Sequence, residues 1–257
     1  MGYKQNIDKI KEHYLEEKHI QRRIELATKG FTGELITHNF KKFVNLLAPY
    51  KEGEKIADMG CGFGYLTHFL PDYVEVCVLD ISPLALGIAR KFREDFLKVQ
   101  GDAHNTPFTD GVFDKLFCIS LTLHLLDVNK ALKEWFRILK PNGLAVITFL
   151  NKFGLANIPF LIFKIRFGYY FSYNIMTPSP QNSFNYHEMG KLVEKAGFEI
   201  LETYGWGITF PYFLGQKIPQ VAYKAIDHTI KTQDSPLIKI LSNTIIFKVR
   251  KNGGRRE

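Results

Sequence analysis

The chain has 257 residues, of which 46% are hydrophobic and 23% are charged. This composition is typical of a globular protein that buries a core as one large domain, or as one domain plus a cap. No apolar run reaches the ~18 residues of a membrane-spanning helix. The formal net charge is +8, and the basic excess lies in Phe160–Arg166 and Lys248–Arg256. A nucleic-acid or anionic-membrane partner is therefore permitted but not required.

The three cysteines, Cys61, Cys77 and Cys118, form no C-x-x-C motif. Cys77 and Cys118 fall inside apolar runs, where a thiol packs as a small hydrophobic side chain. An odd number of cysteines without a pairing pattern favours a reducing compartment. The first residues are charged and contain no apolar signal region, so the sequence predicts a cytoplasmic protein that is neither exported nor membrane-spanning.

Residues 1–50 carry two apolar stripes at helical spacing. The first, around Tyr14, is weak, and the second, from Leu35 to Leu47, is stronger. Gly30–Gly33 separates them as a break. We therefore expect a mobile leading helix, a hinge near Gly30, and a second helix that docks on the sheet.

The stretch Lys55–Pro71 reads K-I-A-D-M-G-C-G-F-G-Y-L-T-H-F-L-P. It predicts a buried strand, a tight turn and the start of a helix. Glycines at alternate positions let such a turn take positive φ and let a ligand lie against the backbone. A nucleotide-like ligand is expected here. The third glycine comes one residue too early for G-x-G-x-x-G, and Asp58 would repel a phosphate, so an NAD-dependent oxidoreductase is disfavoured.

The string D-M-G-C-G-F-G closely resembles motif I of the class I S-adenosylmethionine (SAM) dependent methyltransferases. The resemblance implies SAM as cofactor and S-adenosylhomocysteine as product. It also implies cofactor contacts from the acid, the following turn and the leading helix: Asp58, Gly60, Cys61, Gly62, Gly64 and Tyr14. The favoured alternative is that Tyr14 is an ordinary half-buried aromatic side chain.

The next apolar run, Val74–Asp80, predicts a strand that ends in an acid, and Ser82 and Pro83 predict a helix start. An acid at the carboxyl end of the second strand of a doubly wound sheet lies beside the first turn. Asp80 is thus expected to accept hydrogen bonds from two ribose hydroxyls, with Ile81 beside it. A helix-flanking acid is the alternative role.

A third strand, Phe96–Gln100, leads into G-D-A-H-N-T-P-F-T-D-G-V-F-D, residues 101–114. This string resembles the ubiquinone and type 11 branch of the same family. The resemblance implies that Asp102 meets the adenine amino group and that the Ala103 amide meets a ring nitrogen, which suits a carboxylate acceptor and an amide donor. His104 is expected to be a solvated turn residue.

A fourth strand, Lys115–Ser120, precedes a loop with His124, at the sheet edge where open α/β folds place their chemistry. Ser120 is expected at the cofactor. His124 is the imidazole at that edge that could deprotonate an acceptor, although in the resembled branch a histidine here often only packs beneath the ligand. A helix at Val128–Leu139 and a strand at Leu144–Leu150 follow, joined by a turn at residues 140–143.

Residues 151–184 interrupt the pattern with an aromatic segment that also contains Lys164 and Arg166. Three interpretations stay open: a lid over the acceptor pocket, an interfacial helix on a membrane, and a dimerisation or core helix. The lid interpretation makes these aromatic residues, and one near the end of the sixth strand, candidates for binding the acceptor: Phe160, Phe163, Phe167, Tyr169, Tyr170 and Trp206.

A helix at Tyr186–Ala196 with a glycine stop at Gly197, strands at Phe198–Tyr204 and Thr244–Arg250, and one or two intervening helices complete the chain. The predicted fold is α/β: a doubly wound, Rossmann-like, seven-stranded and mostly parallel sheet with an antiparallel last strand and a helical cap. The predicted division is N-terminal helices or cofactor lid (1–50), SAM-binding core (51–150), cap insertion (151–184), and the C-terminal part of the sheet with a helical insertion and basic tail (185–257).

The function expected from the sequence is SAM-dependent methyl transfer to an oxygen, nitrogen or carbon of a small or lipid-like apolar molecule. Methylation of RNA or protein through the basic insertion and tail is one alternative, and a SAM-binding protein without turnover is another. A peripheral membrane contact is compatible with the aromatic segment, and nucleic acid is the less favoured partner. No metal-ligand cluster is expected. The acceptor, its methylated atom, the use of a general base and the oligomeric state stay open.

Overall fold

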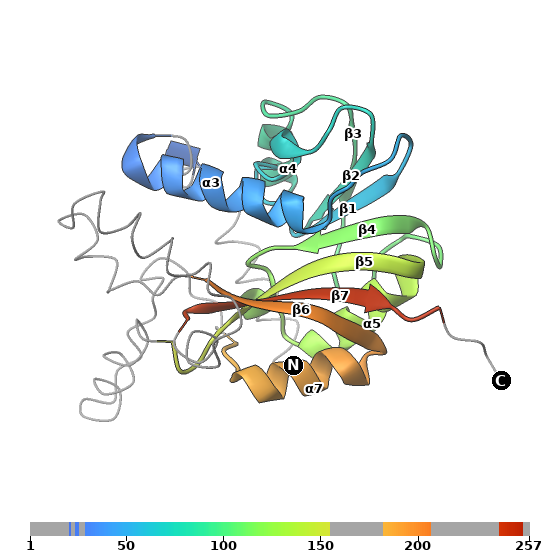
Figure 1. The fold of residues 1–257 in the computed structure, drawn as a ribbon. Helices are drawn as coiled ribbons and strands as arrows, with labels where there is room; N and C mark the ends of the chain where they lie inside the picture. The colour runs from blue at the N-terminus through green and yellow to red at the C-terminus, as the bar shows by residue number, and fades with distance from the viewer. Residues whose placement is uncertain (1–20, 22–23, 26–28, 155–181, 207–241, 254–257) are drawn as a thin grey trace, which may run out of the picture.

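The structure is a computed structural model that describes residues 21, 24–25, 29–154, 182–206 and 242–253. In this part of the chain, seven strands form one sheet in the order β3-β2-β1-β4-β5-β7-β6 (Figure 1). The strands are β1 Lys55–Met59, β2 Glu75–Asp80, β3 Phe96–Gln100, β4 Phe113–Cys118, β5 Leu139–Leu150, β6 Phe198–Trp206 and β7 Thr244–Lys251.

The strand directions confirm the predicted topology. β1 pairs in parallel with β2 and β4, β2 with β3, and β4 with β5. β7 lies between β5 and β6 and runs antiparallel to both. The strand order reverses between β1 and β4, and ligands of doubly wound sheets bind outside the carboxyl ends of the strands at such a switch point.

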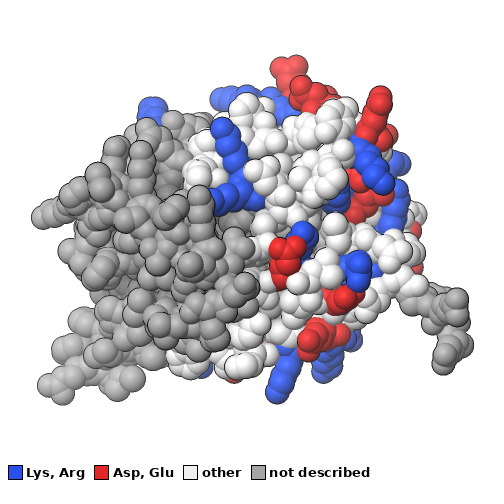
Figure 2. All heavy atoms as spheres, in the orientation of Figure 1, with Lys and Arg blue, Asp and Glu red and all other residues white. Residues whose placement is uncertain are grey.

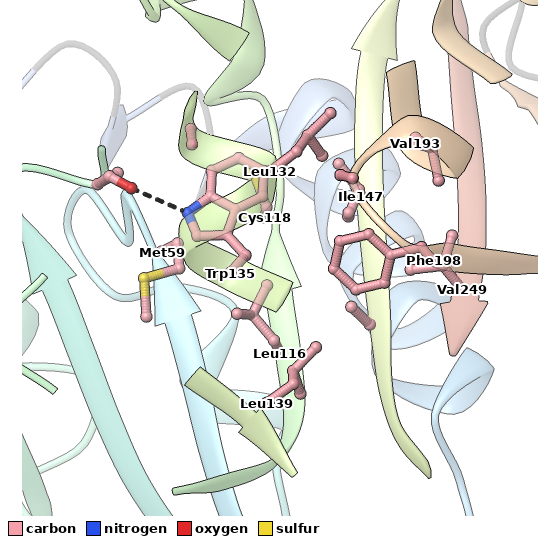
Figure 3. Packing of buried hydrophobic residues seen from close by; sticks show 14 of the residues in the cluster. Met59, Leu116, Cys118, Leu132, Trp135, Leu139, Ile147, Val193, Phe198 and Val249 are labelled. Atoms are coloured by element: carbon pink, nitrogen blue, oxygen red, sulfur yellow. Dashed lines mark hydrogen bonds between the residues drawn. The ribbon is translucent and has the colours of Figure 1, made fainter. Parts of the chain in front are cut away.

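Helices cover both faces of the sheet (Figure 1). α3 (Gly30–Leu46) and α4 (Pro83–Ala89) pack on one face, and α5 (Val128–Ile138) and α7 (Tyr186–Lys195) pack on the other. Successive strand residues point to opposite faces, so in β1 Ile56 joins the α3 side and Ala57 joins the α5 side. Trp135 of α5 is fully buried at the centre of the larger cluster (Figure 3).

Helix starts follow the predicted chemistry. The Ser82 side chain accepts a hydrogen bond from the Ala85 amide at 3.2 Å, with Pro83 at the first helical position, as predicted. Asn185 and Glu188 form a capping box at the start of α7, which satisfies two otherwise unpaired amides. Gly197, with φ +103°, follows the end of α7, so the predicted glycine stop is confirmed.

The helix expected after the glycine turn is reduced to one 3-10 turn, η1 (Thr67–Phe69). A longer α-helix would need an amide at position 71 to donate to the Thr67 carbonyl, and Pro71 has none. The buried Arg93 guanidinium donates to the carbonyls of Thr67, Leu70 and Pro71 at 3.2–3.4 Å instead. A side chain from beyond α4 thus supplies the donors that a helix would have contributed.

Two predicted breaks lie elsewhere. α3 begins at Gly30 and continues through Gly33, so the break is confined to the start of the helix. The predicted turn at residues 140–143 lies within β5, where the register against β4 shifts between Phe113 and Lys115. Asn142 has φ +63° there, which identifies an irregularity inside one long strand.

Candidate functional site

A cavity lies at the carboxyl ends of β1 to β4 and comprises about 1030 Å³ of empty space including its open mouth. Its walls come from the glycine turn after β1, the end of β2, the loop after β3 and the loop after β4. This is the switch point of the sheet, where an open α/β fold is expected to bind its ligand.

The glycine turn shapes one wall through its backbone. Gly60, Gly62 and Gly64 have φ of +69°, +55° and +73°, a conformation that favours glycine. A Cβ at Gly60 would lie 2.7 Å from the Leu121 side chain, and one at Gly64 would lie 2.7 Å from the Ala89 Cβ. A Cβ at Gly62 would meet no protein atom within 4 Å. Gly60 and Gly64 therefore allow close packing, whereas Gly62 exposes its backbone to the cavity.

Asp80 joins the glycine turn to the end of β2. Its Oδ2 accepts a hydrogen bond from the Gly62 amide at 2.8 Å, and its Oδ1 accepts one from the Ser82 amide at 2.9 Å. The carboxylate lines the cavity. Because it accepts a hydrogen bond from the Gly62 amide, Asp80 stabilises the conformation of the turn. It also places a negative charge beside the turn.

Asp58, at the carboxyl end of β1, lies beneath the turn and is only 3% exposed. Its Oδ2 has no hydrogen-bond partner among the described residues. Burial, together with the smaller effect of the negative charge of Asp80, raises the pKa of Asp58 to about 7. A buried carboxylate with neither donor nor counterion is costly to ionise, so this acid lacks one positive partner.

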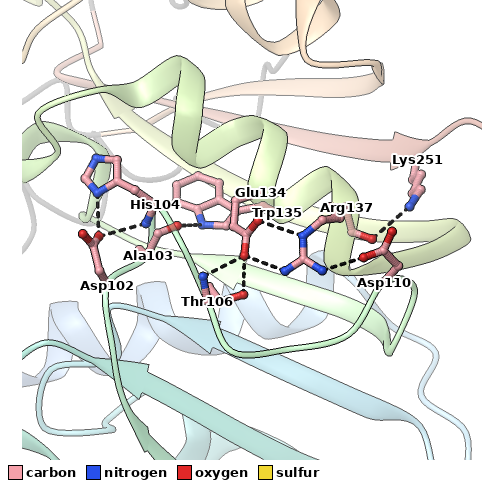
Figure 4. A network of polar contacts seen from close by, with 9 residues as sticks. All are labelled: Asp102, Ala103, His104, Thr106, Asp110, Glu134, Trp135, Arg137 and Lys251. Atoms are coloured by element: carbon pink, nitrogen blue, oxygen red, sulfur yellow. Dashed lines mark hydrogen bonds and ion pairs between the residues drawn. The ribbon is translucent and has the colours of Figure 1, made fainter.

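The loop after β3 corrects the expectation for His104. The imidazole is only 6% exposed, and its Nδ1 lies 2.6 Å from Asp102 Oδ1 (Figure 4). The His104 backbone amide donates to the same oxygen at 2.9 Å. These hydrogen bonds lower the pKa of Asp102. His104 Nε2 accepts a hydrogen bond from the amide of Asp127, the N-cap of α5, at 3.3 Å, a contact that residues 101–114 alone do not reveal.

A polar network fastens this loop to α5 (Figure 4). Glu134 Oε1 accepts hydrogen bonds from the Thr106 amide at 2.7 Å, the Thr106 hydroxyl at 2.6 Å and Arg137 at 2.7 Å. The Arg137 and Thr106 hydrogen bonds lower the pKa of Glu134 to about 2. Trp135 Nε1 donates to the Ala103 carbonyl at 3.2 Å. The loop is therefore held by α5 without any ligand.

The loop after β4 contributes the opposite wall. Ser120 lines the cavity with φ +57°, and its amide donates to Thr148 Oγ1 at 2.7 Å. A positive φ is unusual for serine and marks local backbone strain. His124 ends the 3-10 helix η2 (Thr122–His124), is partly buried and also lines the cavity.

Comparison with known proteins agrees with this geometry. The family described as "Methyltransferase domain" matches residues 57–147. Residues 57–147 form a class I SAM-dependent methyltransferase domain.

Two curated relatives resemble the methyltransferase domain in sequence. One is a demethylmenaquinone methyltransferase of Paenarthrobacter aurescens, 31% identical over 43% of this chain and 44% of the relative. Another is a tRNA U34 carboxymethyltransferase of Campylobacter curvus, 32% identical over 41% of this chain and 38% of the relative. The chain thus spans less than half the length of either relative.

A solved structure shares the fold. The crystal structure of a SAM-dependent methyltransferase from Thermotoga maritima has a TM-score of 0.66 and 19% identity, and the match covers 95% of this chain and 100% of that one. At this level of identity the likeness establishes the Rossmann-like fold, and it agrees with the seven-stranded sheet described above.

The residues of the methyltransferase domain fit SAM, which carries an ammonium group, a ribose and an adenine. The unpartnered Asp58 oxygen lies under the turn, where an ammonium group would supply the missing positive charge. The open space over Gly62 admits a ligand against the backbone. Asp102 has one oxygen, Oδ2, to which no described residue donates, and its side chain is 38% exposed.

The structure gathers several of the predicted cofactor residues at one cavity. Seven of them line it: Gly60, Gly62, Asp80, Ile81, Asp102, Ala103 and Ser120. His124 lines the same cavity from the β4 loop. Asp58, which precedes the turn, and Cys61 and Gly64, which belong to it, are not among the residues that line the cavity.

The predicted acceptor residues are not brought together in the described part of the chain. Trp206 ends β6 and packs edge-to-face against Phe43 of α3, with ring centroids 5.9 Å apart, away from the cavity lining. The other candidates lie outside the described residues: Tyr14, Phe160, Phe163, Phe167, Tyr169 and Tyr170. The predicted helices of residues 211–242 lie almost entirely outside them as well.

Sequence reasoning missed the apolar part of the cavity wall. Phe63, Leu121, Leu125 and Leu126 all line the cavity. Leucines in a short loop carry no ligand signal of their own, although their position directly after the fourth strand could have indicated them. His104 was missed because its partner Asp127 comes 23 residues later.

No helix of the described residues is long and apolar enough to cross a bilayer. In the same part of the chain, no group of three or more His, Cys, Asp or Glu side chains is arranged to hold a metal ion.

Proposed function

We propose that the whole chain is an enzyme that transfers a methyl group from SAM to an oxygen, nitrogen or carbon of a small or lipid-like apolar molecule. The observation that carries this proposal is the cavity at the switch point. Three successive parallel strands each bring one acid to this edge of the sheet. Asp58 is the last residue but one of β1, Asp80 is the last residue of β2, and Asp102 follows β3. A dinucleotide site would instead place unopposed amides toward a pyrophosphate.

In this proposal each acid meets one part of the cofactor. Asp58 balances the charge of the ammonium group, Asp80 accepts from the ribose hydroxyls, and Asp102 accepts from the adenine amine beside the Ala103 amide. SAM supplies an already activated sulfonium methyl group when bound. The chain therefore needs chiefly to align the reactants and exclude water, and alignment of this kind contributes ~7–11 kcal/mol in intramolecular reactions.

The apolar acceptor is supported by the wall opposite the glycine turn. Ile119, Leu121, Leu125 and Leu126 line the cavity there, and such a wall favours an apolar body over a charged one. His124 is the proposed general base if the acceptor must lose a proton, a role that contributes about 10²- to 10⁴-fold in rate.

The ends of the predicted cap also meet this wall. The Asn182 amide donates to the Leu123 carbonyl at 3.0 Å, and the Phe184 amide donates to the Leu150 carbonyl at 3.1 Å. The Lys152 amide donates to the Phe184 carbonyl at 2.8 Å. Asn182, at which the described chain resumes, therefore lies beside the β4 loop.

Calorimetry followed by a methyl-transfer screen tests the proposal. We expect SAM and S-adenosylhomocysteine to bind and NAD not to bind. Radiolabelled SAM incubated with pools of apolar phenols, amines and lipids should then yield labelled product. Binding without product across such pools would indicate a SAM-binding protein without turnover, and binding of NAD alone would contradict the proposal.

Methylation of RNA is the second candidate, favoured by the net charge of +8 and by the tRNA-modifying relative. On the face in Figure 2, however, Lys and Arg side chains of the described residues alternate with Asp and Glu. RNA binding through phosphates should weaken steeply with salt. A tRNA affinity that is absent, or that does not change between 50 and 200 mM salt, would exclude this candidate.

A further inference from the structure

His104 lines the cavity wall, and described groups hold its imidazole ring at both nitrogens. Nδ1 lies 2.6 Å from Asp102 Oδ1, and Nε2 lies 3.3 Å from the backbone amide of Asp127. The ring is 6% exposed. It therefore joins the loop after β3 to the residue that caps α5.

These two partners fix the tautomer of the ring. A backbone amide can only donate a hydrogen bond, so Nε2 of His104 must accept from Asp127. The ring proton then resides on Nδ1, which donates to Asp102. A proton on Nε2 would set two donors against each other, so the arrangement favours the tautomer with its proton on Nδ1.

The same contacts leave the two oxygens of Asp102 unequal. Oδ1 accepts both the His104 backbone amide and the ring Nδ1–H, which matches the two lone pairs of a carboxylate oxygen. Oδ2 accepts no hydrogen bond from the described residues. The side chain is 38% exposed and lines the cavity, so Oδ2 is the oxygen available to a ligand.

We propose that His104 is a positioning residue that locks the Asp102 carboxylate with Oδ2 toward the ligand, and so makes the cavity select a purine that carries a 6-amino group. This inference rests on the proposed function. His104 does not touch the reacting atoms and acts through Asp102. If the carboxylate could rotate freely, ordering it on binding would cost conformational entropy. This cost would offset part of the free energy of its hydrogen bond to the amine.

Two substitutions separate this role from a merely structural one. Asn in His104→Asn places an amide nitrogen near the position of Nδ1 and keeps a donor to Asp102. Gln in His104→Gln reaches the position of Nε2 and keeps an acceptor for the Asp127 amide. If His104 positions Asp102, the His104→Asn variant should keep the preference for a 6-amino purine. If His104 only connects the loop to α5, the His104→Gln variant should keep this preference better.

The measurement is the ratio of two dissociation constants of the whole chain. One ligand is S-adenosylhomocysteine, and the other is its analogue with hydrogen in place of the adenine 6-amino group. A hydrogen bond to a charged group predicts about 10- to 100-fold preference for the adenine ligand in the unchanged protein. We expect His104→Asn to retain most of this preference and His104→Gln to reduce it to about threefold or less.

Equal ratios in the unchanged protein and in His104→Gln would overturn the inference while leaving the proposed function intact. Failure of the unchanged protein to bind S-adenosylhomocysteine would overturn the proposed function and this inference with it. If the variants do not fold, nitrogen-15 NMR of histidine-labelled protein still decides. The Nδ1–H tautomer of His104 supports the proposal, and the Nε2–H tautomer contradicts it.

Discussion

The glycine turn after β1 and the loop after β3 each present an acid to one cavity, in opposite settings. Asp58 is 3% exposed and has an oxygen without a partner, and its pKa is raised to about 7. Asp102 is half-exposed and receives two hydrogen bonds on one oxygen, which lower its pKa. Both acids belong to motifs of one family, yet only one of them is paired within the described residues.

The difference shows that the two ends of the site are pre-organised for ligand binding to different degrees. The β3 loop is complete by itself, because Trp135 and Glu134 of α5 hold it and His104 orients its acid. The glycine turn has the right backbone but still needs a positive charge. A ligand that spans both regions would find a rigid site at one end and would complete the electrostatics of the other.

The largest effect should come from Asp80→Ala, which removes a support of the glycine turn. The variant loses the acceptor of the Gly62 amide and the proposed ribose contact together. We expect calorimetry to show affinity for S-adenosylhomocysteine weakened by about 100-fold or more. His124→Ala is the matched control at the opposite wall and should change the affinity by less than about threefold. Equal losses in both variants would contradict the assigned roles.

Glu134→Gln tests whether α5 holds the β3 loop. Gln directs an amide group at Arg137 in place of a carboxylate, so we expect the free energy of unfolding at pH 7 to fall by about 2 kcal/mol. The folded-state pKa of Glu134 is about 2, against an ordinary value of 4.5 for a glutamate side chain. Its contribution is therefore complete above about pH 4.5 and is lost as the pH falls through 2.

Urea denaturation between pH 7 and pH 2 checks this expectation, since the gap between the two proteins should close over that range. Asp110→Asn is the control, because Asp110 pairs with the same Arg137 but has a side chain that is 80% exposed. An exposed ion pair of this kind contributes about 0–1 kcal/mol. A gap that persists at pH 2 would show that the carboxylate charge of Glu134 is not the cause.

Asp58→Asn tests whether Asp58, the acid before the glycine turn, must ionise to bind a positively charged ligand group. The pKa of about 7 in the free protein means that an ammonium ligand must first ionise Asp58 below pH 7. We expect the affinity of the unchanged protein for S-adenosylhomocysteine to rise by about 10-fold between pH 5.5 and pH 7.5. The Asn variant should show a flat profile there, measured by calorimetry. A parallel rise in both proteins would assign the titration to another group.

The same substitution should change stability in a defined direction. Because the folded-state pKa of Asp58 is raised, the folded protein binds more protons than the unfolded chain between about pH 4 and pH 7. The contribution of Asp58 to stability therefore falls as the pH rises through that window. Asp58→Asn should consequently be more stable than the unchanged protein at pH 8, by about 1–2 kcal/mol, in thermal denaturation.

Of these substitutions, Trp135→Phe should have the smallest effect on stability and ligand affinity. It removes the hydrogen bond from Nε1 to the Ala103 carbonyl but keeps an aromatic ring in the core. We expect the free energy of unfolding to fall by about 1 kcal/mol and ligand affinity to change by less than about threefold. A larger loss of affinity than in Asp80→Ala would mean that the β3 loop, rather than the glycine turn, controls binding.

Much of the fold could be predicted because its signals are local. Apolar runs located the seven strands, and Ser82, Pro83 and Gly197 marked the helix boundaries through chemistry that acts within a few residues. The acids that end strands followed from topology alone, since parallel strands bring their carboxyl ends to one edge.

The missed features depend on distant partners. The helix after the glycine turn ends before Pro71, which has no amide to donate, and only the donors that replace the helical ones are distant, since they come from Arg93, more than 20 residues later. His104 is expected from sequence to be a turn residue because nothing near it in the sequence reveals its hydrogen bond with the N-cap of α5. The raised pKa of Asp58 depends on its burial and on the charge of Asp80, and neither can be inferred from one motif.

The positions of the two tryptophans have an optical consequence. Trp135 is fully enclosed behind the β3 loop, and Trp206 lies against Phe43 of α3. Since the chain contains only these two indoles, its intrinsic fluorescence comes from one ring in the sheet core and one at the helix that begins at Gly30. In Trp135→Phe the emission would arise from Trp206 alone, so the protein would report any displacement of α3 without an added label.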